Sequence, residues 1–202
     1  MNTTPPHISE LICTRISHDL IGNIGAVANA VELLEEGDMD FLDDIRSILK
    51  VSSQVLAARL KFFRMAFGLE NANLEDASLV RKTTADYLKT VGNQNSKIEL
   101  EIGDYTTSYA RLIMVSVMVL ADLVIRDGKI SVKEDGRKLY VNIYSLTKLS
   151  EQKKTVLTTL LSGAEAEYLA QYAPVFYLKE LLKASELPVS ISEGDDYGLI
   201  IG

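Results

Sequence analysis

The feature that most constrains this chain is a pair of apolar patterns at helical spacing in its first third. In residues 7–36 the apolar side chains recur every three or four positions, which places them on one face of a helix. They are Ile12, Ile16, Leu20, Ile24, Val27, Val31 and Leu34. After a break at Gly37-Asp38, a second pattern of this kind covers residues 39–67, and Gly68 stands where a helix C-cap is expected. Two long helices with a short connection predict an antiparallel hairpin.

The second helix carries more apolar surface than one helix–helix seam requires. One stripe consists of Ile45, Leu49, Leu56, Leu60, Phe63 and Phe67, and a second stripe beside it consists of Phe41, Ile48, Val51 and Val55. The first stripe can pack on the first helix, so the second stripe needs another partner. A hairpin from another subunit would complete a dimeric four-helix bundle, and the C-terminal part of the chain is the alternative cover. We expect the homodimer.

The pattern changes after residue 68, where helical and strand periodicities alternate. Helices are expected at 77–91, 109–125, 151–161 and 173–184, and strands at 97–102, 129–133, 138–144, 189–193 and 198–201. We therefore predict two domains in an α+β fold. Residues 1–68 form the helical hairpin, and residues 69–202 form an α/β sandwich with helices on one face of a small mixed sheet.

Composition excludes several classes of function. The 202 residues carry a net charge of -7, which disfavours binding to nucleic acid or to an anionic membrane. One cysteine and two histidines leave no disulfide framework and no zinc site. The N-terminus lacks the plan of a signal peptide, and the longest apolar run is too short to span a bilayer. We expect a cytoplasmic protein.

One of the two histidines, His18, lies in the first helix. At about 100° of rotation per residue, its side chain projects away from the apolar stripe of that helix. The same face carries Leu11, Ile21, Gly22 and Gly25. An imidazole beside small residues on a rigid helix can be reached by another protein, so we expect these four residues to form a docking surface.

The residue types around His18 suit phosphoryl transfer. A neutral imidazole is nucleophilic and can form a P–N bond. Asp19 can accept a hydrogen bond from Nδ1–H, which fixes the tautomer that leaves Nε2 free to attack. Arg15, at the rim of the docking surface, can contact the transferring phosphoryl oxygens. A His-Asp pair alone is more often a solvated surface feature, so the assignment depends on the sequence around it.

That surrounding sequence resembles the phospho-acceptor helix of ChpT-type histidine phosphotransferases of alphaproteobacteria. The likeness is carried by residues 12–27, ICTRISHDLIGNIGAV, and continues through Asn29 and residues 32–34. By this resemblance His18 is the phosphorylated residue and Asp19 its acidic neighbour. The order of elements after residue 68 is similar to that of the ATP-binding domain of histidine kinases.

The chain departs from the family pattern at two positions. Sensor kinases usually place Thr or Asn four residues after the histidine, where this chain has Gly22. Asn23 follows, where a proline is usual. Gly22 leaves no polar group to position a hydrolytic water, which fits a phosphoryl carrier better than a kinase or phosphatase.

The second domain lacks the residues that nucleotide binding requires in such a domain: an Asn for Mg²⁺, an Asp-x-Gly-x-Gly motif for adenine and a Gly-rich phosphate loop. Aligning the strand at 128–132 with the kinase strand that follows the Asn box puts Val115 and Val119 at the asparagine positions. Residues 142–146 contain no Asp-x-Gly-x-Gly motif, and residues 171–177 contain no glycine. We expect no nucleotide and no metal in this chain.

Together these observations predict a histidine phosphotransferase of a two-component phosphorelay. A receiver aspartate would load His18, which would pass the phosphoryl group to receivers of response regulators, and the receiver would supply Mg²⁺. The resemblance implies a CckA-type hybrid histidine kinase upstream and CtrA- and CpdR-type regulators downstream. Two alternatives remain: an active ATP-dependent histidine kinase, and a non-catalytic dimeric scaffold in which His18 is idle.

Overall fold

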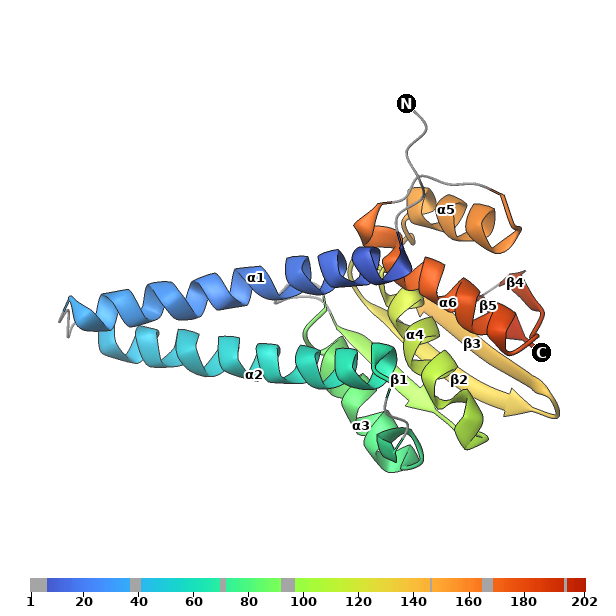
Figure 1. Ribbon diagram of the computed structural model, residues 1–202, viewed down its shortest axis with the longest axis horizontal. Helices are drawn as coiled ribbons and strands as arrows, with labels where there is room; N and C mark the ends of the chain where they lie inside the picture. Colours follow the sequence, from blue (N-terminus) through green and yellow to red (C-terminus); the bar gives the residue numbers. More distant parts are fainter. Residues whose placement is uncertain are drawn as a thin grey trace.

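A long antiparallel helical hairpin projects from a more compact α/β body (Figure 1). The computed structural model describes residues 7–36, 41–69, 72–91, 97–145, 147–164, 169–194 and 196–202. The hairpin consists of α1 (Ile8–Glu35) and α2 (Leu42–Phe67), close to the predicted bounds. The predicted break at Gly37-Asp38 lies outside the described residues. Both helices reach the α/β body at one end and extend well beyond it at the other (Figure 1).

Local interactions explain where the hairpin helices begin and end. The backbone N–H of His7 donates to the carboxylate of Glu10 at 3.0 Å, which caps the start of α1. Gly68 is the C-cap of α2, as predicted. A Cβ atom at this position would collide with the carbonyl oxygen of Arg64, so the chain can leave α2 in this direction only with a glycine.

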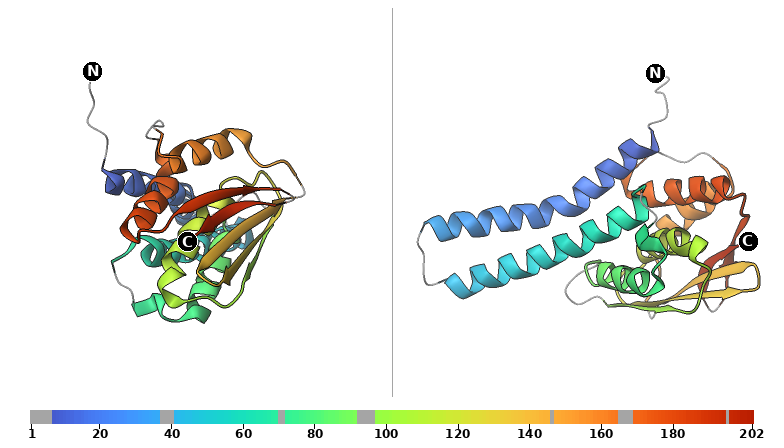
Figure 2. Two further views of the ribbon diagram at one scale, coloured as in Figure 1. Left: turned by 90° about the vertical axis from the view of Figure 1, so that its right-hand side faces the viewer. Right: turned by 60° about the horizontal axis from the view of Figure 1, so that its bottom comes forward.

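The α/β body contains a five-stranded mixed sheet with helices on one face (Figure 2). The helices are α3 (Ala77–Leu88), α4 (Ala110–Ala121), α5 (Glu151–Leu161) and α6 (Ala173–Ala184), with short 3-10 turns η2 (Ala72–Leu74), η3 (Thr107–Tyr109) and η4 (Ala170–Tyr172). The strands are β1 (Ile98–Ile102), β2 (Gly128–Asp135), β3 (Lys138–Ser145), β4 (Val189–Glu193) and β5 (Tyr197–Ile201). Their order is β1-β2-β3-β5-β4, and only β1 and β2 pair in parallel among these strands.

One face of the sheet is apolar because alternate side chains of each strand point the same way. On β3 these are Leu139, Val141 and Ile143, which are buried, and Val141 pairs with Leu199 of β5. Helices α3, α4 and α6 lie over this face (Figures 1 and 2). The sheet and its helices thus form the predicted two-layer sandwich.

Helix α4 is the centre of this layer. Every one of its residues except Arg111 is buried, so the helix has no solvent face. It is shorter than the predicted range of 109–125, because residues 107–109 form η3 and the helix ends at Ala121. Asp122 follows as its C-cap.

The apolar core continues from the α/β body into the near half of the hairpin. Leu11, Ile12 and Leu20 of α1 and Phe62 and Phe63 of α2 belong to the same cluster as α4. Helix α2 ends one residue before the predicted domain boundary at 68, but the core crosses that boundary. The division into domains 1–68 and 69–202 therefore stays a prediction. Among the described helices, none is both long enough and apolar enough to cross a membrane.

Candidate functional site

His18 lies where α1 leaves the α/β body, and its side chain is 83% exposed. Its outward orientation was predicted from the helix rotation and is confirmed. The nearest carboxylate oxygen, Oδ1 of Asp19, is 3.5 Å from Nδ1 of His18. With Asp19 on the Nδ1 side of the ring, Nε2 faces solvent and can be reached by an incoming electrophile.

Arg15 lies one turn before Asp19, but its guanidinium points into the protein. Nε donates to Oδ2 of Asp19 at 2.8 Å, while Nη1 and Nη2 each donate to one carboxylate oxygen of Asp122 at 2.9 Å. Nη1 also donates to the backbone carbonyl of Gln171 at 2.9 Å. Since four of its five N–H groups are used in this way, Arg15 is not free to grasp a phosphoryl group. We correct the predicted direct contact: Arg15 links Asp19 to the α/β body.

A second arginine, which sequence reasoning missed, supports the same turn of α1. Arg59 of α2 donates from Nη1 to the backbone carbonyl of Asp19, and it also donates to the hydroxyl and the carbonyl of Thr90. Arg59 thereby joins α1, α2 and the end of α3 behind the exposed histidine. The sequence signal for Arg59 was its charge, because it stands between apolar positions of α2.

Asp122 was also missed. Its position gave one signal, because it directly follows a helix whose apolar residues are buried on every side. Sequence periodicity could not show that this carboxylate meets an arginine 107 positions earlier in the chain.

The predicted docking residues divide into two groups. Ile21 is 64% exposed, and Gly22 and Gly25 lie on the same outward side of α1 with no atom within 4 Å of a Cβ built on either. Leu11 is only 7% exposed and belongs to the core, because the near end of α1 packs on the α/β body. Leu11 is therefore removed from the predicted docking surface.

The positions aligned with the nucleotide-binding residues of kinases have structural roles here. Val115 and Val119 lie in the core of α4, with Val119 2% exposed. The segment aligned with the phosphate loop forms η4 and the start of α6, where Tyr172 is buried and Gln171 accepts a hydrogen bond from Arg15. Both regions thus support the packing of α1 and the sheet.

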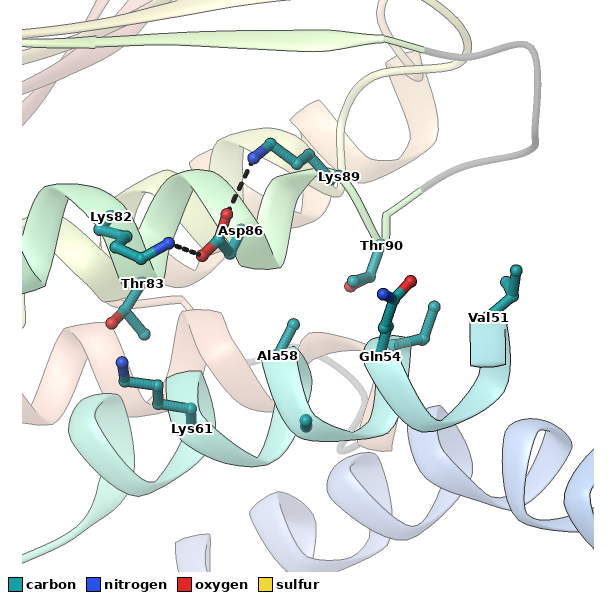
Figure 3. A pocket seen from close by; sticks show the side chains of 11 residues that line it. Val51, Gln54, Ala58, Lys61, Lys82, Thr83, Asp86, Lys89 and Thr90 are labelled. Atoms are coloured by element: carbon teal, nitrogen blue, oxygen red, sulfur yellow. Dashed lines mark hydrogen bonds and ion pairs between the residues drawn. The ribbon is translucent and has the colours of Figure 1, made fainter. Parts of the chain in front are cut away.

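A groove lies between α2 and α3 (Figure 3). Its volume is about 690 Å³, and it is lined by Lys61, Lys82 and Lys89 with Asp86 between the last two. Asp86 accepts hydrogen bonds from Lys82 at 3.0 Å and Lys89 at 2.8 Å, and the bond from Lys89 is the main cause of its lowered pKa. Among the residues that line it there is no histidine or cysteine. The candidate nucleophile therefore remains His18.

No protein-family model matches the chain. Over 61 residues the chain is 46% identical to "Protein phosphotransferase ChpT" of Brucella abortus (strain 2308), an alignment that covers 30% of this chain and 28% of that relative. The resemblance to ChpT-type phosphotransferases is confirmed. The alignment spans less than a third of the length of this ChpT relative, so it does not by itself transfer the activity of the whole protein.

Solved structures give the fold. A structure described as a bacterial phosphotransferase is similar with a TM-score of 0.78 and 24% identity, covering 100% of this chain and 98% of the other. A lower similarity, with a TM-score of 0.34 and 15% identity, relates the chain to the Acinetobacter baumannii histidine kinase AdeS and covers 91% of this chain and 95% of that one. The first of these confirms the predicted fold, a helical hairpin followed by an α/β sandwich. The likeness of the sandwich to the ATP-binding domain of histidine kinases stays a prediction.

Proposed function

We propose that this protein is a histidine phosphotransferase, which takes a phosphoryl group from a receiver aspartate onto His18 and passes it to a second receiver. The observation that carries the proposal is the geometry of His18: an exposed imidazole with Asp19 on its Nδ1 side, on a turn of helix held by two arginines. The resemblance to a ChpT phosphotransferase supports the same reading.

The chemistry of the first transfer follows from this arrangement. The lone pair on Nε2 of His18 forms a P–N bond while the P–O bond to the receiver aspartate breaks, and that bonding pair stays on the aspartate carboxylate. The proton on Nδ1 remains on the ring, so the product is a phosphoimidazolium whose N–H faces Asp19. In the second transfer another receiver aspartate attacks phosphorus, and the P–N pair returns to Nε2.

The receiver supplies what this chain does not offer near His18. In the proposal it brings the Mg²⁺ and the groups that hold the phosphoryl oxygens, while this chain supplies an oriented nucleophile on a rigid helix. Ile21, Gly22 and Gly25 form the docking surface, because Ile21 offers an exposed apolar side chain and the two glycines allow close approach. The partners proposed from the resemblance are the receiver of a CckA-type hybrid kinase and those of CtrA- and CpdR-type regulators, met in the cytoplasm.

We further propose that the protein acts as a homodimer through the far half of the hairpin. Phe41, Ile48 and Val51 of the second stripe of α2 are exposed, and so are Ile24, Val31 and Leu34 of α1. The far end of the hairpin projects beyond the α/β body (Figure 1), and these side chains remain exposed in the single chain. A second hairpin could bury them in a four-helix bundle.

The test is transfer of label from a phosphorylated receiver domain to the full chain. We expect label on the wild type and on Arg46→Ala, an exposed control on α2, and none on His18→Ala. No label on the wild type would contradict the proposal and favour the scaffold alternative. Label acquired directly from magnesium-ATP would favour the kinase alternative.

A further inference from the structure

The carboxylate of Asp122 occupies an unfavourable position for a helix terminus. It follows the last residue of α4, where the partial negative charge of the helix dipole repels an anion. Its side chain is also largely screened from water. A carboxylate is retained at such a place only if a cation compensates it, and Arg15 of α1 is that cation.

The Arg15–Asp122 pair is built for fixed geometry. Both oxygens of the carboxylate accept from the guanidinium at 2.9 Å, an arrangement that defines the plane of the guanidinium as well as its position. Burial by itself would lower the pKa of Arg15, but the carboxylates of Asp122 and Asp19 raise it above its ordinary value. Arg15 therefore stays charged at physiological pH.

Asp122 is itself held from the α5 side. Nζ of Lys153 donates to the backbone carbonyl of Asp122 at 2.7 Å, and the backbone N–H of Ser150 donates to the carbonyl of Leu123 at 2.9 Å. The carboxylate thus projects from a segment with little freedom. Its position is set by the α/β body and not by α1.

From this anchor a continuous series of contacts reaches the imidazole. Arg15, which pairs with Asp122, also donates a hydrogen bond from Nε to Oδ2 of Asp19 at 2.8 Å. The other carboxylate oxygen of Asp19, Oδ1, lies 3.5 Å from Nδ1 of His18. Arg59 holds the backbone carbonyl of Asp19 from the opposite helix. Because both the side chain and the backbone carbonyl of Asp19 are held by hydrogen bonds, the orientation of its carboxylate relative to His18 is fixed.

We propose that Asp122 is a positioning residue for His18: acting through Arg15 and Asp19, it fixes the ring in the tautomer that presents Nε2 to the receiver. This inference rests on the proposed function and gives the α/β body a part in it. That body orients the acceptor histidine from the end of α4, the same helix whose buried Val115 and Val119 are predicted to stand where a kinase has metal ligands. Asp122 lies behind α1 and does not form part of the docking surface.

The experiment compares Asp122→Asn with the wild-type full chain in two measurements. In single-turnover transfer from a phosphorylated receiver, we expect the maximal rate to fall on the order of 10-fold, because the ring loses its fixed orientation. The receiver concentration at half-maximal rate should not change, since Asp122 does not touch the receiver. In ¹⁵N NMR, assigned with His18→Ala, we expect the His18 ring to change from the Nδ1–H tautomer to a mixture.

Two further variants separate positioning from folding. Arg15→Lys keeps the charge but cannot form the bidentate pair, so it should reproduce both effects even if Asp122→Asn proves unstable. Asp86→Asn is the matched control, because this carboxylate also pairs with cations but lies in the groove between α2 and α3. It should leave both the rate and the tautomer unchanged.

Wild-type rate and tautomer in folded Asp122→Asn and Arg15→Lys would overturn the inference and leave the proposed function intact. A rise in the half-maximal receiver concentration without loss of maximal rate would also overturn it, because that result indicates docking. A wild type that takes no label would instead overturn the proposed function itself.

Discussion

Helix α4 and the far half of the hairpin are both rich in valine, leucine and isoleucine, yet they use these side chains in opposite ways. Val119 of α4 is 2% exposed, whereas Val31 of α1 is 42% exposed. Helix α4 is enclosed by the sheet, α3, α6 and the near half of the hairpin, while the far half of α1 lies beside α2 and, among the described elements, away from the sheet and its helices (Figure 1). The α/β body therefore uses its apolar residues to complete its own core, whereas the far half of the hairpin leaves several of its apolar side chains exposed, as the proposed dimer requires.

The largest expected effect is at Val119. The predicted alignment with kinases puts an asparagine at this position, but Val119→Asn should lower the free energy of unfolding by about 3 kcal/mol, because it buries an amide without hydrogen-bond partners. Urea denaturation of the full chain measures this change. The variant should gain no magnesium-dependent ATP binding at millimolar nucleotide, since the other nucleotide motifs are also missing.

Unchanged stability of Val119→Asn would show that α4 can open toward solvent. Binding of ATP by the same variant would contradict our interpretation of the domain as nucleotide-free.

A charge at Val31 should weaken dimer association and leave the stability of the monomer almost unchanged. Val31→Glu is expected to weaken dimer association by at least about 10-fold, roughly 1.4 kcal/mol, because it places a carboxylate in the proposed bundle seam. The monomer should lose no more than about 0.5 kcal/mol, since the side chain is already exposed in it. Sedimentation velocity at micromolar concentration checks this prediction. A wild type that sediments as a monomer would contradict the dimer.

The smallest effect concerns the docking surface. Gly22→Ala should raise the free energy of unfolding by about 0.5–1 kcal/mol, because the methyl group meets no neighbour and alanine favours the helix. It should also raise the receiver concentration needed for half-maximal transfer, since the methyl group lies on the approach to His18. The reciprocal control, Ala28→Gly on an exposed position of α1, should lower stability and leave transfer unchanged. Stabilisation without any change in transfer would remove Gly22 from the docking surface.

Periodicity alone predicted much of this fold. The bounds of α5, α6 and β4 agree with those expected from the apolar pattern, because the apolar side chains of each element recur at the period of a helix or of a strand. The end of α4 was predicted less well. A stretch that is apolar at nearly every position has no clear periodicity, and the helix stops at Ala121 although Leu123 is still buried.

The candidate site shows where sequence reasoning stops. The outward orientation of His18 and Ile21 was predicted correctly, because the direction of a side chain on a helix follows from its residue number. The helix rotation placed Leu11 on the same face, but it could not show that the α/β body covers that end of α1. The partners of Arg15 were equally out of reach, since Asp122 and Gln171 come to it only through tertiary packing.

The most direct test of the central claim is the position of the phosphoryl group after the full chain has reacted with a phosphorylated receiver. Tandem mass spectrometry at neutral to alkaline pH can locate it on a single peptide before a P–N bond hydrolyses. Our account predicts one acid-labile phosphoryl group, on His18. A group on His7, an acid-stable group on a hydroxyl side chain, or an unmodified chain would contradict it.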